Sequence, residues 1–378
     1  MRLAHISDLH IGKRVNEFSM LADQRHILWQ MLDIFDEEKI DGVIIAGDVY
    51  DKSTPITEAV TLFDELLYEL AKRELYVFII SGNHDSSERL AFGGRLFKEN
   101  KIFISPVYNG EISPVTINDE NGEINFYLLP FIKPSSVRKY NECEVSTYTE
   151  ALSLVIEKMN VDKSKRNILV THEFVTGAQR SESEEISVGG SDNVDCEIMA
   201  DFDYVALGHL HKPQSVTESK IRYCGTPLKY SFSEANDKKT VTVLDIREKG
   251  SLEITERELK PLRDLVEIKG TYEEITKKDF YQDTGLQNDY VHITLTNEDD
   301  VVDALAKLRL VYPYLMKLDY DNQRTRASYD ISGAENVENK TPLELFSELF
   351  ALQNDREMSK EQSELLAKLI EEIWEGEI

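Results

Sequence analysis

The feature that most constrains this sequence is an apolar, β-branched run at residues 43–46 that stops at Gly47 and is followed at once by Asp48. Such a run is typical of a strand that is buried on both faces of a sheet. Four other apolar runs also lead to polar residues: 3–6 to Asp8 and His10, 76–80 to Asn83, His84 and Asp85, 168–170 to His172, and 204–207 to His209 and His211. Ligands of open α/β sheets bind outside the carboxyl ends of the strands, so we expect these groups to share one crevice. Their convergence predicts an enzyme.

The segments between these runs alternate between helical and strand patterns. Apolar residues recur at helical intervals over 18–35 and 60–70, and helices between strands indicate βαβ crossovers with helices on the faces of a sheet. Short strands are expected over 102–130, where Asn109-Gly110 and Asn121-Gly122 favour hairpins. A helix over 148–159 and strands at 221–224 and 240–246 are expected to complete an α/β domain of residues 1–265.

Two smaller units are expected after residue 265. Residues 266–340 contain strand patterns at 290–295 and 315–318 around a helical pattern at 299–310, which predicts a small α+β module that ends in a polar linker at 321–339. In residues 341–378, the capping boxes that begin at Thr341 and Ser359 each predict a helix with one apolar side. The sequence leaves open whether these helices dock on their own chain or on a helix of a partner.

Composition and charge narrow the class of protein. The net charge of −27 over 378 residues argues against a general electrostatic attraction to nucleic acid, but it is compatible with a local site. We expect a cytoplasmic protein, because the sequence has neither a membrane-span pattern nor a signal-peptide pattern. The three cysteines lack a CxxC pattern and indicate neither a disulfide framework nor a zinc cluster. The Gly-, Ser- and acid-rich stretch 177–195 predicts a long exposed loop, either close to the site or without function.

Seven polar side chains that follow the strands are candidate metal ligands: Asp8, His10, Asp48, Asn83, His172, His209 and His211. Oxygen ligands mixed with imidazoles suit manganese, iron or zinc better than calcium or magnesium. A carboxylate can bridge two ions about 3.5 to 4 Å apart, and we assign that role to Asp48. The expected partition gives one ion Asp8, His10 and His211, and the other Asn83, His172 and His209.

Any one of these motifs alone is more often explained by a buried, hydrogen-bonded residue than by a metal ligand. Their joint occurrence is what predicts a two-metal site. The other three histidines, His5, His26 and His292, lie inside strand-like or helical runs and are interpreted as structural.

The order of the motifs resembles the calcineurin-like metallophosphoesterase superfamily, whose signature runs DxH, GDxxD, GNHD, H and GHxH. Within that superfamily, four stretches resemble the SbcD family, the nuclease subunits of bacterial SbcCD complexes; they are 6–13, 47–51, 203–214 and 225–235. The resemblance is specific over residues 1–245, weaker through the α+β module, and returns in the two C-terminal helices.

This resemblance implies an architecture and a set of partners. The core would be a four-layer α/β/β/α fold, residues 266–340 would cap the site and grip duplex DNA, and residues 341–378 would bind the coiled coil of an SbcC-type ATPase. The implied activity is that of a Mn²⁺-dependent DNA nuclease, with double-strand exonuclease and single-strand or hairpin endonuclease action. It would work as a homodimer within a heterotetramer, in DNA end processing, repair, recombination and replication.

The resemblance also assigns roles within the site. The seven ligands would hold two divalent ions, a metal-bound hydroxide would attack phosphorus in line, and His84 would be the catalytic histidine that protonates the leaving oxygen. Asp85 or Asp51 is expected to orient His84, although some relatives have histidine where this chain has Asp51. The basic residues nearest the motifs either hold phosphates or are solvated surface charges; they are Lys52, Arg89, Arg95, Lys212 and Lys229.

Two other functions stay open. A phosphatase or cyclic-nucleotide phosphodiesterase of the same superfamily would use the same metal core. Against it, Lys52-Ser53 stands where protein phosphatases commonly have Arg-Gly, and a long segment follows the core. A scaffold subunit whose ATPase partner does the chemistry is the third hypothesis, but it has no need of seven costly polar groups in one crevice.

Overall fold

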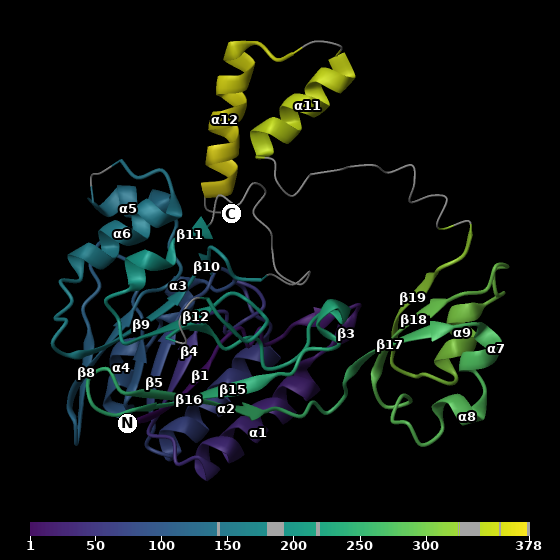
Figure 1. The fold of residues 1–378 in the computed structure, drawn as a ribbon, viewed down its shortest axis with the longest axis horizontal. Coiled ribbons are helices and arrows are strands. Elements are labelled where there is room, and N and C mark those ends of the chain that lie inside the picture. The colour runs from purple at the N-terminus through teal and green to yellow at the C-terminus, as the bar shows by residue number, and fades with distance from the viewer. Residues whose placement is uncertain are drawn as a thin grey trace.

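The computed structural model describes residues 1–141, 144–179, 193–216, 220–323, 325, 341–354 and 357–375 (Figure 1). Most of the predicted loop 177–195 and most of the predicted linker 321–339 lie outside these residues. Among the described residues, no helix has the length and apolar character needed to cross a membrane.

The first sheet contains the apolar run at residues 43–46. Its six strands lie in the order β16 (Leu252–Glu258), β15 (Thr240–Ile246), β1 (Arg2–Ile6), β4 (Gly42–Ala46), β5 (Tyr76–Ile80) and β6 (Ile102–Ile104). In this sheet β1, β4, β5 and β6 are parallel to one another, and β15 and β16 run antiparallel to their neighbours. Helices α1 (Leu21–Glu37) and α2 (Thr57–Lys72) supply apolar side chains to the core on the outer face of this sheet.

The second sheet also has six strands, in the order β13 (Gln214–Ser215), β14 (Ile221–Tyr223), β12 (Tyr204–Gly208), β9 (Arg166–His172), β8 (Gly122–Leu128) and β7 (Val115–Asp119). The four central strands are parallel, and the two edge strands are antiparallel. Helices α5 (Pro134–Asn141) and α6 (Tyr148–Lys158) pack on its outer face.

The two sheets pack against each other through their inner faces. Along β4 the side chains alternate: Val43 and Ile45 contribute to the core under the helices, while Ile44 and Ala46 contribute to the core between the sheets. Phe78 of the first sheet stacks on Phe126 of the second, with ring centroids 3.8 Å apart. The predicted four-layer α/β/β/α core is therefore confirmed, and its layers can be followed in Figure 1.

The remaining elements of this part of the chain are short. They are β2 (Arg14–Val15), β3 (Phe18–Ser19), α3 (Ser87–Leu90), α4 (Gly94–Phe97), β10 (Phe174–Val175), β11 (Asn193–Val194), and the 3-10 helices Lys98–Asn100, Cys196–Met199 and Phe232–Glu234.

Local predictions were partly correct. The turn at Asn121-Gly122 joins β7 to β8 in a hairpin, as predicted. The hairpin predicted at Asn109-Gly110 is wrong, because β6 belongs to the first sheet and β7 to the second, so this turn lies in the crossing between them. The helix predicted from residue 18 begins only at Leu21, since Phe18 and Ser19 pair with β2 instead.

A third, three-stranded sheet follows the core. It is formed by the parallel strands β17 (Leu265–Gly270), β18 (Tyr290–Leu295) and β19 (Leu315–Tyr320), accompanied by α7 (Tyr272–Ile275), α8 (Lys278–Tyr281) and α9 (Ala304–Arg309). Strand β17 was not predicted. The helix predicted from residue 299 begins only at Ala304, because Asp303 has a φ of 52° and a left-handed residue does not continue an α-helix.

The third sheet is tied to the core through α1. The Tyr290 hydroxyl donates to Asp23 Oδ2 at 2.8 Å, and Arg263 lies 3.4 Å from the other Asp23 oxygen. Asp23 is fully buried, and the Arg263 guanidinium also stacks on Tyr314 with 4.6 Å to the ring centroid. A buried carboxylate is stable when a cation and a hydroxyl group are its partners, so Asp23 stabilises the contact between the third sheet and α1.

Two helices close the chain, α11 (Pro342–Asn354) and α12 (Lys360–Glu375), and they contact each other. Both predicted capping boxes are present. Thr341 accepts a hydrogen bond from the Glu344 backbone N–H, and Gln362 donates its backbone N–H to Ser359 Oγ. The Glu344 and Gln362 side chains accept in return from the Thr341 and Ser359 backbone.

Candidate metal centre

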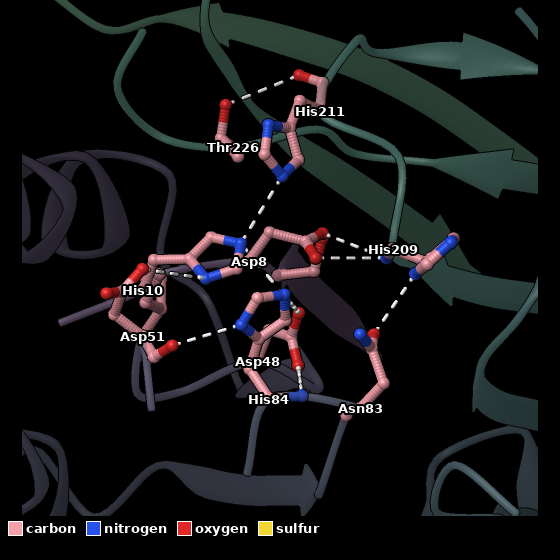
Figure 2. Close-up of polar contacts among 12 residues, drawn as sticks. Asp8, His10, Asp48, Asp51, Asn83, His84, His209, His211 and Thr226 are labelled. Carbon is pink, nitrogen blue, oxygen red and sulfur yellow. Dashed lines mark hydrogen bonds and ion pairs between the residues drawn. The ribbon is translucent and has the colours of Figure 1, made fainter. Parts of the chain in front are cut away.

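The loops that leave β1 and β4 are hydrogen-bonded to each other, and this places their acidic and imidazole side chains in one cluster (Figure 2). The Asp8 N–H donates to the Gly47 carbonyl at 3.0 Å, and the His10 N–H donates to the Asp48 carbonyl at 3.0 Å. Asp8, His10 and Asp48 have φ values of 53°, 42° and 48°. Left-handed backbone at non-glycine residues is unfavourable and concentrates at functional sites, where the surrounding structure holds it.

Glycines allow three strand ends to approach this closely. A Cβ atom on Gly208 would lie 1.9 Å from the Ala46 carbonyl oxygen, and one on Gly82 would lie 2.1 Å from Asp48 Oδ1. Neither backbone nor a buried carboxylate can move far enough to admit a methyl group at that distance. The glycines of the GNHD and GHxH motifs are therefore required for the approach of β5 and β12 to β4.

Asp48 lies at the centre of this cluster. Its Oδ2 atom is 3.4 Å from His172 Nε2, 3.8 Å from His10 Nε2 and 3.9 Å from His84 Nε2. Its Oδ1 atom accepts the His84 backbone N–H at 2.9 Å. One carboxylate thus faces imidazoles from three different segments, which is the position predicted for a bridging ligand.

The other candidates lie in two groups around Asp48, and Asp8 also lies 3.9 Å from His172 Nε2. On one side His10 Nε2 and His211 Nε2 are 3.3 Å apart, beside the buried Asp8. On the other side Asn83 Oδ1 lies 3.0 Å from His172 Nε2 and 3.1 Å from His209 Nδ1. The structure brings all seven predicted ligands together.

His84 and Asp85 stand at the edge of this group and have different surroundings. The His84 ring is 21% exposed, and its Nδ1 lies 3.0 Å from the Asp51 backbone carbonyl. The Asp85 carboxylate instead accepts three backbone N–H groups, from Val49, Tyr50 and Gly82. The orientation of His84 therefore comes from the Asp51 carbonyl oxygen, while Asp85 fastens the loop after β5 to the loop after β4.

Comparison with known proteins identifies the family. A family model described as calcineurin-like phosphoesterase matches residues 1–213, and a second, described as type 5 capsule protein repressor C-terminal domain, matches residues 261–354. The chain is 34% identical to the SbcD component of the nuclease SbcCD of Staphylococcus epidermidis over 385 aligned positions, which cover 100% of both chains. The chain belongs to the SbcD family of calcineurin-like phosphoesterases.

Solved structures that resemble this member of the SbcD family include a protein of Thermus thermophilus and a dimetal phosphatase of Danio rerio. Each is 12% identical and covers 68% of this chain, with 98% of the first protein and 96% of the second aligned. The TM-scores are 0.41 and 0.40. Neither likeness bears on the substrate.

The side chains present fit divalent metal ions, as expected for a calcineurin-like phosphoesterase. The potential ligand atoms of Asp8, His10 and His211 lie within 4.8 Å of one another, and so do those of Asp8, Asp48 and His172. His10 Nδ1 is buried and makes no hydrogen bond within the described part of the chain. That atom faces Asp51 Oδ1 at 3.9 Å, while His10 Nε2 faces Asp48 and His211. Buried carboxylates mixed with imidazole nitrogens at these distances suit a divalent cation.

Burial and mutual proximity shift the pKa values of the acidic groups and of His172. Burial, helped by Asp48, raises the pKa of Asp8 to about 6. Burial lowers the pKa of His172, but Asp48 and Asp8 outweigh it and raise that pKa to about 10. Burial also opposes ionisation of Asp48, yet the neighbouring histidines hold its pKa well below the usual range. Asp48 is ionised at neutral pH and is stabilised by positive charge at this point.

A buried polar network behind His211 was not predicted from the sequence. It comprises Glu234, Lys239 and Thr226, which are 0%, 4% and 0% exposed. Burial raises the pKa of Glu234, but His211 and Lys239 outweigh burial and lower it to about 2. The resemblance of the stretch 225–235 to SbcD proteins was the one available signal, and it gave neither Thr226 nor Glu234 a role.

Proposed function

We propose that this chain is the manganese-dependent, two-metal DNA nuclease subunit of a complex with an SbcC-type ATPase, and that it processes DNA ends in repair and recombination. One observation carries the proposal: a single Asp48 oxygen lies 3.4 to 3.9 Å from ring nitrogens of three histidines. It occurs in a chain related along its full length to the SbcD component of a nuclease SbcCD.

The seven ligands would hold the ions in the two groups described above, with Asp48 between them. When bound there, divalent ions would supply Lewis-acid activation of water and of the phosphate. Manganese is favoured because mixed oxygen and imidazole donors suit it better than they suit magnesium or calcium. The protein's own part is to fix these donors, which it does by burying Asp8, Asp48 and His172 at strand ends.

His84 is the proposed general acid. Its Nδ1–H donates to the Asp51 carbonyl at 3.0 Å, which leaves Nε2 directed toward the crevice. This hydrogen bond can persist whether or not Nε2 carries a proton, so the ring stays in place while the Nε2 proton passes to the leaving oxygen as the P–O bond breaks. Partial exposure of the ring at 21% allows a phosphate to reach it.

We assign DNA contact to the exposed lysines beside the metal ligands and to the module at 266–340, as a cap over the site. Lys52 follows the Asp48 loop, Lys212 follows His211, and both are exposed. By contrast, Arg89 bonds to Ser53 and Thr54, and Lys229 pairs with Asp264. Lys52 and Lys212 are therefore the stronger candidates for phosphate contacts.

Residues 341–378 are the proposed docking segment for the coiled coil of the ATPase. Apolar side chains at helical spacing remain exposed on both helices; they are Phe346 at 49%, Leu349 at 49%, Leu365 at 60% and Leu369 at 42%. An amphipathic helix that leaves such residues exposed is suited to packing on another helix. This supports docking on a partner over docking on the chain itself.

We also propose a homodimer within the heterotetramer. Phe92 and Leu96, which lie in and next to α4, are 84% and 74% exposed. Large apolar side chains exposed four residues apart favour a protein contact at this surface.

The test is cleavage of end-labelled linear duplex DNA by the purified chain with Mn²⁺, alone and with an SbcC-type partner, beside a small phosphomonoester. Asp48→Ala is the control that removes the central ligand. The proposal predicts Mn²⁺-dependent DNA cleavage that is lost in Asp48→Ala. Turnover of the phosphomonoester with intact DNA, even with the partner, would establish the phosphatase alternative instead.

A further inference from the structure

A buried ion pair lies directly behind one of the candidate ligands. Glu234 ends the 3-10 helix Phe232–Glu234, and its backbone N–H donates to the Ser231 carbonyl at 3.0 Å. Its Oε2 accepts from Lys239 Nζ at 2.5 Å, and both side chains are almost completely buried. Burying two charges is unfavourable unless they are paired and further hydrogen-bonded, and here both side chains also bond to Thr226.

The network holds His211 at two points. Glu234 Oε1 lies 3.4 Å from His211 Nδ1, on the ring. On the backbone, the His211 carbonyl accepts from Lys239 Nζ at 2.8 Å and from the Thr226 N–H at 3.1 Å; Figure 2 shows Thr226 beside this carbonyl. Lys239 also donates to Thr226 Oγ1 at 2.8 Å. Glu234 therefore contacts the ring of His211, while Lys239 and Thr226 hold its backbone carbonyl.

The contact with Glu234 determines which ring nitrogen of His211 faces the metal centre. An ionised carboxylate can only accept, so the proton of a neutral imidazole lies on Nδ1 and the Nε2 lone pair is left for the crevice. His211 Nε2 is the atom that lies 3.3 Å from His10 Nε2.

The corresponding arrangement on the other side of the centre is different. His172 Nδ1 donates to the Ala46 backbone carbonyl at 2.9 Å, which is a neutral acceptor. A carboxylate acceptor makes an imidazole a stronger electron donor than a carbonyl does. The two ion positions therefore have unequal support.

We propose that Glu234, held by Lys239 and Thr226, is a positioning residue that fixes the Nδ1–H tautomer of His211 and thereby strengthens the ion position formed by Asp8, His10 and His211. The inference rests on the proposed function in that these residues are taken as metal ligands. It gives stretch 225–235 a function: Thr226 and Glu234 contact His211 on the side that faces away from the metal centre.

The test compares full-length wild-type protein with the variant Glu234→Met/Lys239→Met, which removes both charges together and replaces them with unbranched apolar side chains. The matched control is Asp119→Asn/Arg166→Met. This control removes another ion pair with a buried arginine, at the opposite end of β9 from His172. Two readouts are used: Mn²⁺ titration by calorimetry, and ¹⁵N NMR of the histidine rings in metal-free protein, with His211→Gln to assign the signal.

We expect the Glu234→Met/Lys239→Met variant to bind one of the two ions about 10 to 100-fold more weakly and the other with unchanged affinity. The His211 ring should move from the Nδ1–H tautomer toward the Nε2–H tautomer, and the control should match wild type in both readouts. A variant that keeps the wild-type affinities and tautomer overturns this inference alone, and so does a control that loses Mn²⁺ equally. Wild-type protein that binds no Mn²⁺ overturns the proposed function as well.

Discussion

The metal centre and the C-terminal helices use their side chains in opposite ways. At the centre, Asp8, Asp48 and His172 are 0%, 2% and 0% exposed and have defined partners within the chain. On α11 and α12, Phe346 and Leu365 are 49% and 60% exposed. The chemistry is thus preorganised inside this chain, whereas the helices present apolar surface that another surface can bury. Substitutions should therefore separate cleavage from partner binding.

The largest effect is expected from Asp48→Ala. Because this residue is the proposed ligand of both ions, its loss should remove Mn²⁺ binding and several kcal/mol of charge stabilisation, which lowers DNA cleavage by roughly 10³ to 10⁴-fold or more. Calorimetry and a gel assay measure the two effects. Asp41→Ala, at the other end of β4, is the control and should retain both Mn²⁺ binding and DNA cleavage. Cleavage that survives in Asp48→Ala would contradict the mechanism.

His84→Ser should separate chemistry from metal binding within the centre. General-acid help contributes about 10² to 10⁴ in rate, so cleavage should fall by that factor while both ions still bind. His26→Ser removes an exposed histidine of α1 and should behave as wild type. Loss of Mn²⁺ from the His84→Ser protein would show that His84 is a ligand instead.

Leu365→Glu should have the converse phenotype. Burying a leucine stabilises a complex by about 1.5 to 3 kcal/mol, so affinity for the ATPase coiled coil should fall by roughly 10 to 100-fold. Cleavage of short DNA without the partner should be unchanged. Ala367→Glu adds the same charge at a position rotated away on α12 and should bind nearly normally. If both substitutions weaken binding to the ATPase equally, the added negative charge and not the loss of the Leu365 contact explains the effect.

A smaller effect is expected from Lys212→Glu, beside the centre. If its ammonium group contacts a phosphate, DNA affinity should fall about 10-fold or less, and the salt dependence of binding should lose about one charge. Lys39→Glu makes the same charge change at the opposite end of the strands and should leave binding intact. Binding curves at several salt concentrations distinguish the two variants.

The smallest effect concerns the stability of the core. Burial acts to raise the pKa of the Asp119 carboxyl, but hydrogen bonds from Arg166 and the chain's amino terminus outweigh burial and lower that pKa to about 2. A depressed carboxyl pKa adds stability above its unfolded value and loses it as pH falls toward the folded value. Asp119→Asn should therefore cost about 1 kcal/mol at pH 7, and the difference should vanish between about pH 4 and pH 2. Urea unfolding at several pH values measures this difference in unfolding free energy.

The control is Asp201→Asn, which removes an exposed ion pair with Lys163 and should show no such pH dependence.

Sequence patterns predicted the strand ends well because their signal is local. Each ligand-bearing loop follows an apolar run, and glycines such as Gly82 and Gly208 mark where strands approach closely. The seven candidate ligands could therefore be named from the ends of the runs, while their partition between two ions stays a prediction. The turn at Asn121-Gly122 and both C-terminal capping boxes are also short-range signals, and all were predicted correctly.

Features that depend on distant contacts could not be predicted. Glu234 lies in a polar stretch that is typical of a surface, and its burial depends on Lys239 and on His211, which precedes it by more than twenty residues. Asp85 or Asp51 was expected to orient His84, but the Asp85 carboxylate accepts backbone N–H groups of Val49, Tyr50 and Gly82. Strand β17 has no apolar run of its own and is defined by its pairing with β18.

The most direct test of the central claim is anomalous diffraction from crystals of the full-length protein grown with Mn²⁺. Our account predicts two manganese ions about 3.5 to 4 Å apart with Asp48 between them, one beside Asp8, His10 and His211 and the other beside Asn83, His172 and His209. A single ion, or ions away from Asp48, would contradict it.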